Sequence, residues 1–263
     1  VSIKVAAGEH HTCAIRNDSW LWCWGWNEDG QLGTGTTDDQ YVPLQADAGE
    51  RWVSVTTGST HTCAIKDDHT LWCWGNNVSG QIGNGKSGAL YKSLEPERIG
   101  SASDWSAVTA GSIHSCALKL DGSLWCWGSN TRGQLGDGTQ EERPNPIEVE
   151  PASSWKSVDA GYFHTCALRE DGSLWCWGDN FAGQLGDGSS GNMRGLPGVV
   201  GQGADWLQVA VGDYHTCARR ADKSIWCWGD NNYGQLGDGT VGGDMGKTVP
   251  VQISAQPRWL DLT

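Results

Sequence analysis

The 263-residue sequence lacks several features that would place it in a familiar class of protein. It has no secretion signal and no apolar run long enough to span a membrane, so we expect Val1 to be the start of a processed or trimmed chain. It also lacks an excess of basic residues. The formal net charge of −13 favours solubility and argues against nucleic acid and anionic membrane surfaces as partners.

Motifs of catalysis and metal binding are missing too. There is no nucleophile elbow, no His-Glu-x-x-His and no phosphate loop, and Glu9 and His10 have no recognisable nucleophile beside them. The Cys-x-x-Cys spacing of zinc sites is absent. Calcium is an alternative at three Gly-Asp-Gly turns, but Thr and Asn hold the same position in the first two copies, which favours a turn residue. These positions are Asp137, Asp187, Asp238, Thr34 and Asn84. We therefore expect no enzyme activity, no cofactor and no metal.

The sequence does contain ten cysteines, all inside a unit that occurs five times. In the fourth copy the unit reads His-Thr-Cys-Ala-Leu over 164–168, a short polar turn, and Leu-Trp-Cys-Trp-Gly over 174–178. Two apolar runs around a polar tip predict a β-hairpin. Gly122 and Gly172 at the third loop position suit a three-residue loop closed by a G1 bulge, where φ is positive.

The register of this hairpin predicts a disulfide across it. If Arg16 and the residue at 20 close the loop, Cys13 faces Cys23 at a non-hydrogen-bonded pair, where Cα atoms approach to about 4.5 Å. Alternation places Cys, Ile and Leu on one face and Thr, Ala and Trp on the other. Because both faces are apolar, we expect each hairpin to be sandwiched between neighbours. The expected bridges, which imply an oxidising compartment, are Cys13–Cys23, Cys63–Cys73, Cys116–Cys126, Cys166–Cys176 and Cys217–Cys227.

The whole repeat is about 50 residues long and predicts a propeller blade. Each copy has a Trp-x-x-Val run, the two hairpin strands, a Gly-rich loop and a Pro-containing strand, which suits an outer edge. We see no helix. The prediction is an all-β propeller in a single domain, residues 1–263, with repeats near 1–51, 52–104, 105–154, 155–205 and 206–258, and with 259–263 starting a sixth copy.

The two ends leave ring closure open. Residues 2–5 form a first strand that lacks its Trp, and residues 259–262 repeat that strand a sixth time. In one interpretation the C-terminal copy closes the ring while the N-terminal one frays, and in another the chain is a fragment of a longer propeller. In a third interpretation, the surplus strand pairs with another molecule, as edge strands do.

The run Gly-Asp-Asn-Phe-Ala-Gly-Gln-Leu-Gly-Asp-Gly at 178–188, preceded by Ala160-Gly161 and His164-Thr165, resembles the regulator-of-chromosome-condensation repeat. The resemblance covers nearly all of the chain, five times over. It implies a β-propeller with blades of this length, seven in the best-known members, where this chain has five copies. The Cys pair resembles secreted bacterial versions rather than the nuclear exchange factor. That factor's inserted wedge and basic tail are not visible here, so neither its exchange activity nor its chromatin binding is carried over.

The candidate binding surface is the end of the propeller where loops enter and leave the hairpins. The opposite end, with the hairpin tips, is acidic, whereas this end is aromatic, most strongly in the fourth and fifth copies. Exposed aromatic side chains indicate a protein-binding surface, and the alternative is that they pack on their own loops. The residues expected to bind are Trp26, Tyr162, Phe163, Phe181, Asp213, Tyr214 and Tyr233.

We therefore expect a secreted, periplasmic or cell-surface module that acts by binding a protein. One alternative is a structural subunit that self-assembles through its surplus strand. Another is a glycan-binding propeller with Trp26, Tyr214 and Tyr233 as stacking platforms. A third is an enzyme inhibitor, because some secreted family members inhibit β-lactamases and likewise present aromatics just before the repeat His. That His is expected to be a structural hydrogen-bonder rather than a metal ligand, at His11, His61, His114, His164 and His215.

Overall fold

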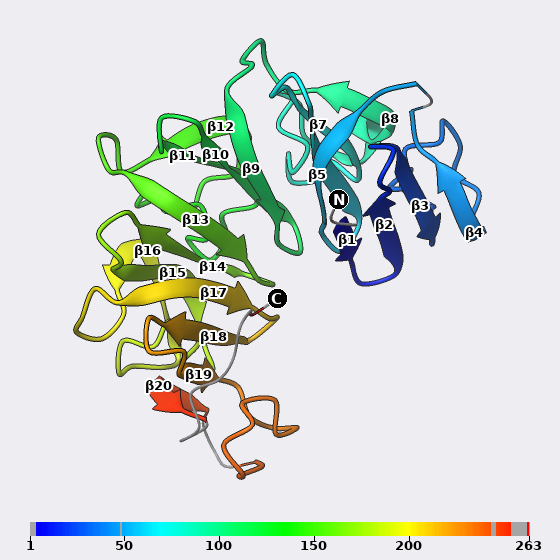
Figure 1. Cartoon of the computed structure of the whole chain (residues 1–263). Helices are drawn as coiled ribbons and strands as arrows, with labels where there is room; N and C mark the ends of the chain where they lie inside the picture. Colours follow the sequence, from blue (N-terminus) through cyan, green and yellow to red (C-terminus); the bar gives the residue numbers. More distant parts are fainter. Residues whose placement is uncertain (1–3, 48, 243–245, 254–261, 263) are drawn as a thin grey trace. The chain divides into compact units, whose positions relative to one another are not determined.

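The computed structural model describes residues 4–47, 49–242, 246–253 and 262. Over these residues the chain forms five four-stranded antiparallel sheets, each with its strands in sequence order (Figure 1). The predicted repeats are therefore propeller blades.

The strands are β1 (Lys4–Ala7), β2 (His11–Ile15), β3 (Leu21–Gly25) and β4 (Gln40–Gln45) in blade 1; β5 (Trp52–Thr57), β6 (His61–Lys66), β7 (Leu71–Gly75) and β8 (Ser93–Arg98) in blade 2; β9 (Trp105–Ala110), β10 (His114–Lys119), β11 (Leu124–Gly128) and β12 (Arg143–Val149) in blade 3; β13 (Trp155–Ala160), β14 (His164–Arg169), β15 (Leu174–Asn180) and β16 (Asn192–Val199) in blade 4; and β17 (Trp206–Val211), β18 (His215–Arg220), β19 (Ile225–Gly229) and β20 (Lys247–Gln252) in blade 5.

The blades belong to two compact units. The first unit, Val1–Asn130 with Glu141–Glu148, holds blades 1 to 3. The second unit, Thr131–Gln140 with Val149–Thr263, holds blades 4 and 5 together with most of the loop that follows β11. No helix was expected, and the described residues contain one short 3₁₀ turn, η1 (Ala89–Tyr91), in the loop before β8.

The central hairpin of each blade has the predicted register. In blade 1, Cys13 lies opposite Cys23 and Ile15 opposite Leu21. The Arg16 amide bonds the carbonyl of Trp20 at 3.0 Å, which closes the loop where expected. All five bridges form within their own blades, each with a Cα–Cα distance of 4.1 Å. The third loop residue has positive φ in every tip, as a G1 bulge requires; these residues are Ser19, His69, Gly122, Gly172 and Lys223.

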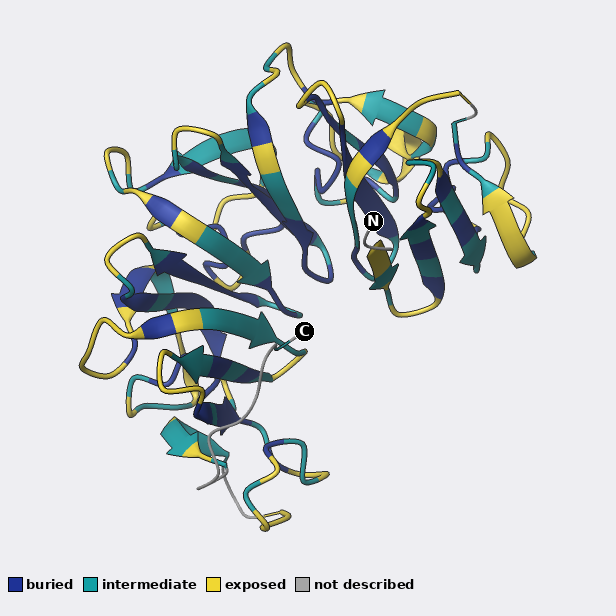
Figure 2. Cartoon of the chain, viewed as in Figure 1, coloured by how far each residue is buried: buried dark blue, intermediate teal, exposed yellow. Residues whose placement is uncertain are grey.

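Within each unit, the core lies between consecutive blades rather than inside one sheet. Cys13, Cys23 and Leu21 on one face of the first hairpin pack with Trp52 and Trp74 of blade 2. Blades 4 and 5 repeat this arrangement in the second unit. Burying one Trp side chain contributes on the order of 4 to 6 kcal/mol of transfer free energy, so these tryptophans dominate the joints. Figure 2 shows the buried central strands of the blades.

The Gly-rich loop that follows each hairpin is held by one asparagine. The Asn27 side chain donates to the carbonyls of Thr36 and Asp38, both at 3.0 Å, and accepts from the Leu32 amide at 3.0 Å. In blades 4 and 5, the Asn180 and Asn231 side chains likewise accept from the backbone amides of Leu185 and Leu236. Because one side chain satisfies two or three backbone groups, each of these loops keeps a fixed shape.

The ends of the chain bear on the ring-closure question. Residues Lys4–Ala7 pair with β2, so for these residues the interpretation in which the N-terminal strand frays is wrong. The surplus strand expected at 259–262 falls outside the described residues except for Leu262. That side chain packs against the buried cluster of Ile225, Cys227 and Leu236 in blade 5.

Candidate binding surface

The loops that enter and leave each hairpin lie at one end of the blade, as the hairpin topology predicts. In blade 4 the Asp179 amide donates to the carbonyl of Phe163 at 2.9 Å, and in blade 5 the Asp230 amide donates to Tyr214 at 2.8 Å. These hydrogen bonds link the two loops directly beyond the strand ends. Aromatic residues from both loops of a blade are therefore presented on the same end.

Three of the predicted aromatic residues form a packed group, which we call the aromatic cluster: Tyr162, Phe163 and Tyr214. The Tyr162 and Tyr214 rings stack with centroids 5.6 Å apart and an interplanar angle of 27°. Phe163 meets Tyr162 edge to face at 4.6 Å. Tyr162 comes from blade 4 and Tyr214 from blade 5, so the cluster bridges the two blades of the second unit. Tyr214 remains 40% exposed.

Phe181 and Tyr233 project from the following loops of the same two blades. Their exposed fractions are 75% and 91%, so neither ring packs on its own loop. Asp213 is exposed beside Tyr214. Trp26 differs from these, because it lies in the first unit, is half-buried and meets His10 edge to face at 6.0 Å. Of the seven predicted residues, the structure thus brings Tyr162, Phe163 and Tyr214 into contact. Three others, Phe181, Asp213 and Tyr233, are exposed in the loops of the same two blades.

A buried carboxylate supports the loops beneath Phe181. Asp179 is 7% exposed and accepts from the Gln184 side chain at 2.8 Å and from the Phe181 amide at 3.4 Å. The Arg132 guanidinium lies 3.9 Å from its other oxygen. Burial is the main cause that raises the pKa of Tyr214, and the nearby Tyr162 and Asp213 side chains raise it further. The Tyr214 hydroxyl therefore stays protonated and can donate a hydrogen bond. Asp179 was not expected from the sequence, although Asp230 repeats its contact with Gln at 2.7 Å in blade 5.

The repeated histidines link neighbouring blades. The Nε2 atoms of His11 and His61 lie 2.8 Å from the hydroxyls of Thr62 and Ser115 in the next blade, and His164 lies 3.0 Å from Thr216. Burial lowers the pKa of His61 to about 3 and that of His11 to about 4. His11 and His61 are therefore neutral, and all three side chains are structural hydrogen-bonding groups, as expected.

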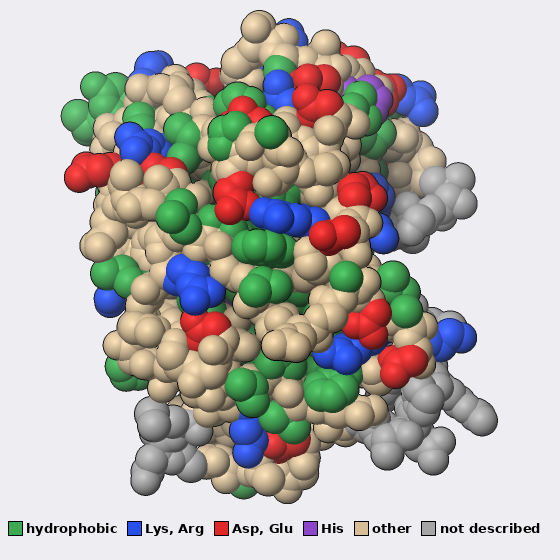
Figure 3. Space-filling view, turned by 90° about the vertical axis from the view of Figure 1, so that its left-hand side faces the viewer, with side chains coloured by type: hydrophobic (Ala, Val, Ile, Leu, Met, Phe, Trp, Pro, Cys, Tyr) green, Lys and Arg blue, Asp and Glu red, His purple; other side chains and the backbone are tan. Residues whose placement is uncertain are grey.

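The hairpin tips carry a feature that the sequence reading missed. A basic residue at the end of the second strand lies over the Trp of the third strand: Lys66 Nζ is 3.8 Å from the Trp72 ring and Arg169 Cζ is 3.9 Å from Trp175. Arg16, Lys119 and Arg220 repeat the contact. On the face drawn in Figure 3, basic side chains lie next to acidic ones. The signal was available, because a Lys or Arg occurs five residues after every repeat His.

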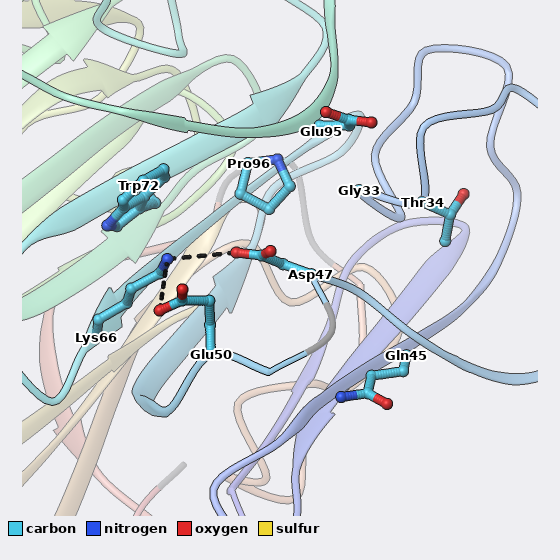
Figure 4. A pocket seen from close by; sticks show the side chains of 9 residues that line it. All are labelled: Gly33, Thr34, Gln45, Asp47, Glu50, Lys66, Trp72, Glu95 and Pro96. Atoms are coloured by element: carbon cyan, nitrogen blue, oxygen red, sulfur yellow. Dashed lines mark hydrogen bonds and ion pairs between the residues drawn. The ribbon is translucent and has the colours of Figure 1, made fainter.

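A cleft in the first unit lies at one of these tips. It has a volume of about 480 Å³ and is lined by nine residues from blades 1 and 2 (Figure 4). Lys66 Nζ lies 3.3 Å from Asp47 and 3.1 Å from Glu50, and its charge faces the Trp72 ring (Figure 4). The Lys66 charge is therefore already compensated by two carboxylates inside the cleft.

The turn carboxylates are engaged by their own turns. Asp187 accepts from the amide and hydroxyl of Ser189 at 2.9 and 2.6 Å and pairs with Arg194 at 3.3 Å. Among the described residues no three His, Cys, Asp or Glu side chains are grouped as a metal site. In the same residues no helix is both long and apolar enough to cross a membrane.

The blade architecture defines this protein as a disulfide-containing β-propeller. Residues 1–261 match the RCC1-like domain. The chain therefore belongs to the RCC1-like domain family.

Individual relatives extend well beyond the matched region. The ultraviolet-B receptor UVR8 of Arabidopsis thaliana is 34% identical over 253 residues, which cover 95% of this chain and 46% of the receptor. The human probable E3 ubiquitin-protein ligase HERC3 is 48% identical over 166 residues, or 62% of this chain and 15% of the ligase. The chain thus spans less than half the length of these curated relatives.

Solved structures agree on the fold. Prp20p from Saccharomyces cerevisiae, studied for binding to Gsp1p and histones, superposes with a TM-score of 0.81 at 22% identity, over 95% of this chain and 63% of Prp20p. Human WBSCR16 superposes with a TM-score of 0.81 at 20% identity, over 95% of this chain and 66% of that protein. At these identities the likeness establishes the fold alone.

Proposed function

We propose that this propeller acts by binding a protein, through the aromatic cluster together with Phe181 and Tyr233. The observation that carries the proposal is the exposure of these rings: Phe181 and Tyr233 are 75% and 91% exposed, next to a stacked tyrosine pair. Exposing large rings to water is unfavourable, and aromatic residues are enriched where partners bind. Trp26 is left out of this surface, because it is half-buried against His10.

A protein partner fits the cluster better than a glycan. Sugar rings stack on the open face of an aromatic ring, but Tyr162 and Tyr214 turn their faces toward each other at 5.6 Å. Phe163 places its edge against Tyr162. The cluster therefore presents packed apolar rings that carry hydroxyl groups, which suits a complementary protein surface.

The charge of the chain indicates the kind of partner. The formal net charge is −13, and Asp213 is exposed beside the cluster. Long-range attraction therefore favours a basic protein surface. A protein of this fold supports protein binding: Prp20p was studied for binding to Gsp1p and histones, and the same protein, yeast RCC1 (Prp20), was solved with Kap60 bound to it.

The proposed location is outside the cytoplasm, in a periplasm or at a cell surface, as in secreted cysteine-containing versions of the repeat. Five disulfides, with all ten cysteines paired, support an oxidising compartment.

The test is a capture experiment with chemical cross-linking on extracellular proteins from the native source. The wild-type chain and the variant Phe181→Ala/Tyr214→Ala/Tyr233→Ala are compared by quantitative mass spectrometry. Truncating central aromatic anchors typically costs more than about 2 kcal/mol each, so we expect the proteins bound by the wild type to fall at least about thirtyfold.

Tyr91→Ala is the matched control, because Tyr91 is 50% exposed in η1 of blade 2 and is not part of the proposed surface. It should retain every protein that the wild type captures. If the triple variant captures the same proteins as the wild type, the surface is wrongly assigned. If a glycan array binds the wild type but not the triple variant, the partner is a sugar rather than a protein.

A further inference from the structure

Two Gly-rich loops of the second unit meet the next hairpin in the same way. A Cβ at Gly178 of β15 would lie 3.3 Å from the Cα of Gln134, in the loop that follows β11. A Cβ at Gly229 of β19 would lie 3.2 Å from the Cα of Gln184, in the loop that follows β15. Because the backbones approach each other so similarly, the contacts of the two loops can be compared residue by residue.

Arg132 and Ala182 hold the same place in these two loops. The Arg132 amide donates to Oε1 of Gln134 at 2.9 Å. The Ala182 amide donates to Oε1 of Gln184 at 2.8 Å. The first loop therefore presents a guanidinium group where the second loop presents a methyl group.

The carboxylates that follow the two strand glycines are equivalent as well. Asp179 accepts from the Gln184 side chain at 2.8 Å, and Asp230 accepts from the Gln235 side chain at 2.7 Å. The backbone amide of each aspartate donates to the loop that enters the same hairpin. Asp230 is thus held in blade 5 as Asp179 is held in blade 4.

The two carboxylates differ in the cation beside them. The Arg132 guanidinium lies 3.9 Å from Oδ1 of Asp179, and Asp179 is 7% exposed. Asp230 has Ala182 at that place and is half-buried, and its Oδ1 accepts from the Asn232 amide at 3.2 Å. No Lys or Arg of the described residues pairs with Asp230. Its charge therefore lacks a counter-ion among them, in a site whose counterpart holds a guanidinium.

The groups around Asp230 favour a cation. Burial lowers the pKa of His215, and the nearby Asp213 and Asp230 carboxylates oppose this effect. His215 is therefore neutral near neutral pH, while the exposed Asp213 adds a second carboxylate. Phe181, the residue before Ala182, is 75% exposed. This part of the surface thus combines two carboxylates with an exposed aromatic ring.

We propose that Asp230 binds an arginine side chain of the partner protein, at the place that Ala182 leaves open. This inference rests on the proposed protein-binding function and names the group that the surface recognises. The internal pair of Arg132 and Asp179 supports a guanidinium as the occupant. A guanidinium is also less strongly hydrated than an ammonium group, and it can stack on a ring such as Phe181 while it donates to a carboxylate.

Two substitutions of Ala182 test this place directly. Ala182→Arg supplies the guanidinium from the chain itself, as Arg132 does in the preceding loop, so it should compete with the arginine of a partner. Ala182→Glu adds a long side chain of opposite charge, so it should attract that arginine. Opposite effects of two large side chains at one position cannot come from steric exclusion. Asp230→Asn removes the carboxylate charge, and Asp222→Asn, at the exposed tip of the same blade, is the matched control.

The probe is the capped tripeptide Gly-Arg-Gly, titrated into the isotopically labelled, oxidised protein and followed by NMR. We expect saturable shifts of the Asp230 and Tyr214 amide signals. Replacing arginine by its neutral isostere citrulline should weaken binding at least about tenfold, because a charge-assisted hydrogen bond is lost. Asp230→Asn and Ala182→Arg should weaken binding of the arginine peptide by a similar factor. Ala182→Glu should strengthen it about threefold, and Asp222→Asn should leave it unchanged.

Three results would overturn the proposal: no saturable shift in the wild type, equal binding of the arginine and citrulline peptides, or the same effect of Ala182→Arg and Ala182→Glu. The capture experiment separates this inference from the proposed function. If the triple aromatic variant loses the captured proteins while Ala182→Arg keeps them, the surface binds its partner without an arginine contact and only this inference is wrong. If the triple variant captures the same proteins as the wild type, the proposed function fails, and the peptide titration still decides whether Asp230 binds arginine.

Discussion

Buried neutral histidine makes the stability of this fold depend on pH. His61 is fully buried, with its Nε2 2.8 Å from the hydroxyl of Ser115. Burial lowers its pKa to about 3, against 6.5 when unfolded. The unfolded chain therefore binds a proton below pH 6.5 that the folded chain excludes. The stability contributed by a neutral His61 is complete above pH 6.5 and is lost as pH falls from there toward 3.

Urea unfolding at several pH values measures this effect. Between pH 6.5 and 5, each such histidine should cost about 2 kcal/mol of the free energy of unfolding. His61→Gln, whose amide can still bond Ser115, should remove about 2 kcal/mol of that pH dependence. His10→Gln is the control, because the His10 side chain is 62% exposed. An unchanged slope in His61→Gln would show that His61 titrates normally in the fold.

At the scale of the structural element, the hairpin tips are stabilised by cations that stack on tryptophan. Lys66 is 6% exposed, lies 3.8 Å from the Trp72 ring and pairs with Asp47 and Glu50. In blade 1, Arg16 makes a looser contact of 5.3 Å with Trp22, and its side chain is 54% exposed. The same motif is therefore desolvated in one blade and solvated in the other.

This difference predicts unequal effects of the same substitution. Lys66→Met keeps most of the apolar stem but removes the charge, and it should cost about 2 kcal/mol because a desolvated cation–π contact is lost. Arg16→Met should cost less than about 0.5 kcal/mol. Urea unfolding of the two variants gives the comparison. Equal losses would mean that burial does not set the strength of the contact.

The hairpin was the element most accessible from the sequence. Period-two alternation and the fixed spacing of Cys13 and Cys23 define a register, so the pairing and the bridge follow from local geometry. The cation at Lys66 was missed because its partners come from two other segments, residues 47–52 and Trp72 on β7. Exposure of Tyr233 and stacking of Tyr162 on Tyr214 were equally out of reach. Alternation gives the face of a strand but not the conformation of a loop side chain.

At the scale of the whole molecule, the disulfides carry a large share of the stability. Each bridge closes a loop between residues ten apart in sequence, worth about 3 kcal/mol in the chain-entropy model. Five bridges together amount to on the order of 15 kcal/mol, as much as the entire stability of a typical domain. The blades interlock through Trp side chains, so loss of the bridges should loosen the joints as well. We therefore expect the fully reduced chain to be unfolded at 37 °C.

Reduction and alkylation followed by near-ultraviolet circular dichroism tests this expectation. The signal of the buried tryptophans should disappear, and limited proteolysis should cleave at many sites. A chain with only Cys63→Ala/Cys73→Ala should remain folded, with a loss of about 3 kcal/mol, because the other bridges persist. If the reduced chain keeps its near-ultraviolet spectrum, the apolar joints suffice alone. The argument for an oxidising compartment would then lose its thermodynamic basis, since the fold would be equally stable where thiols stay reduced.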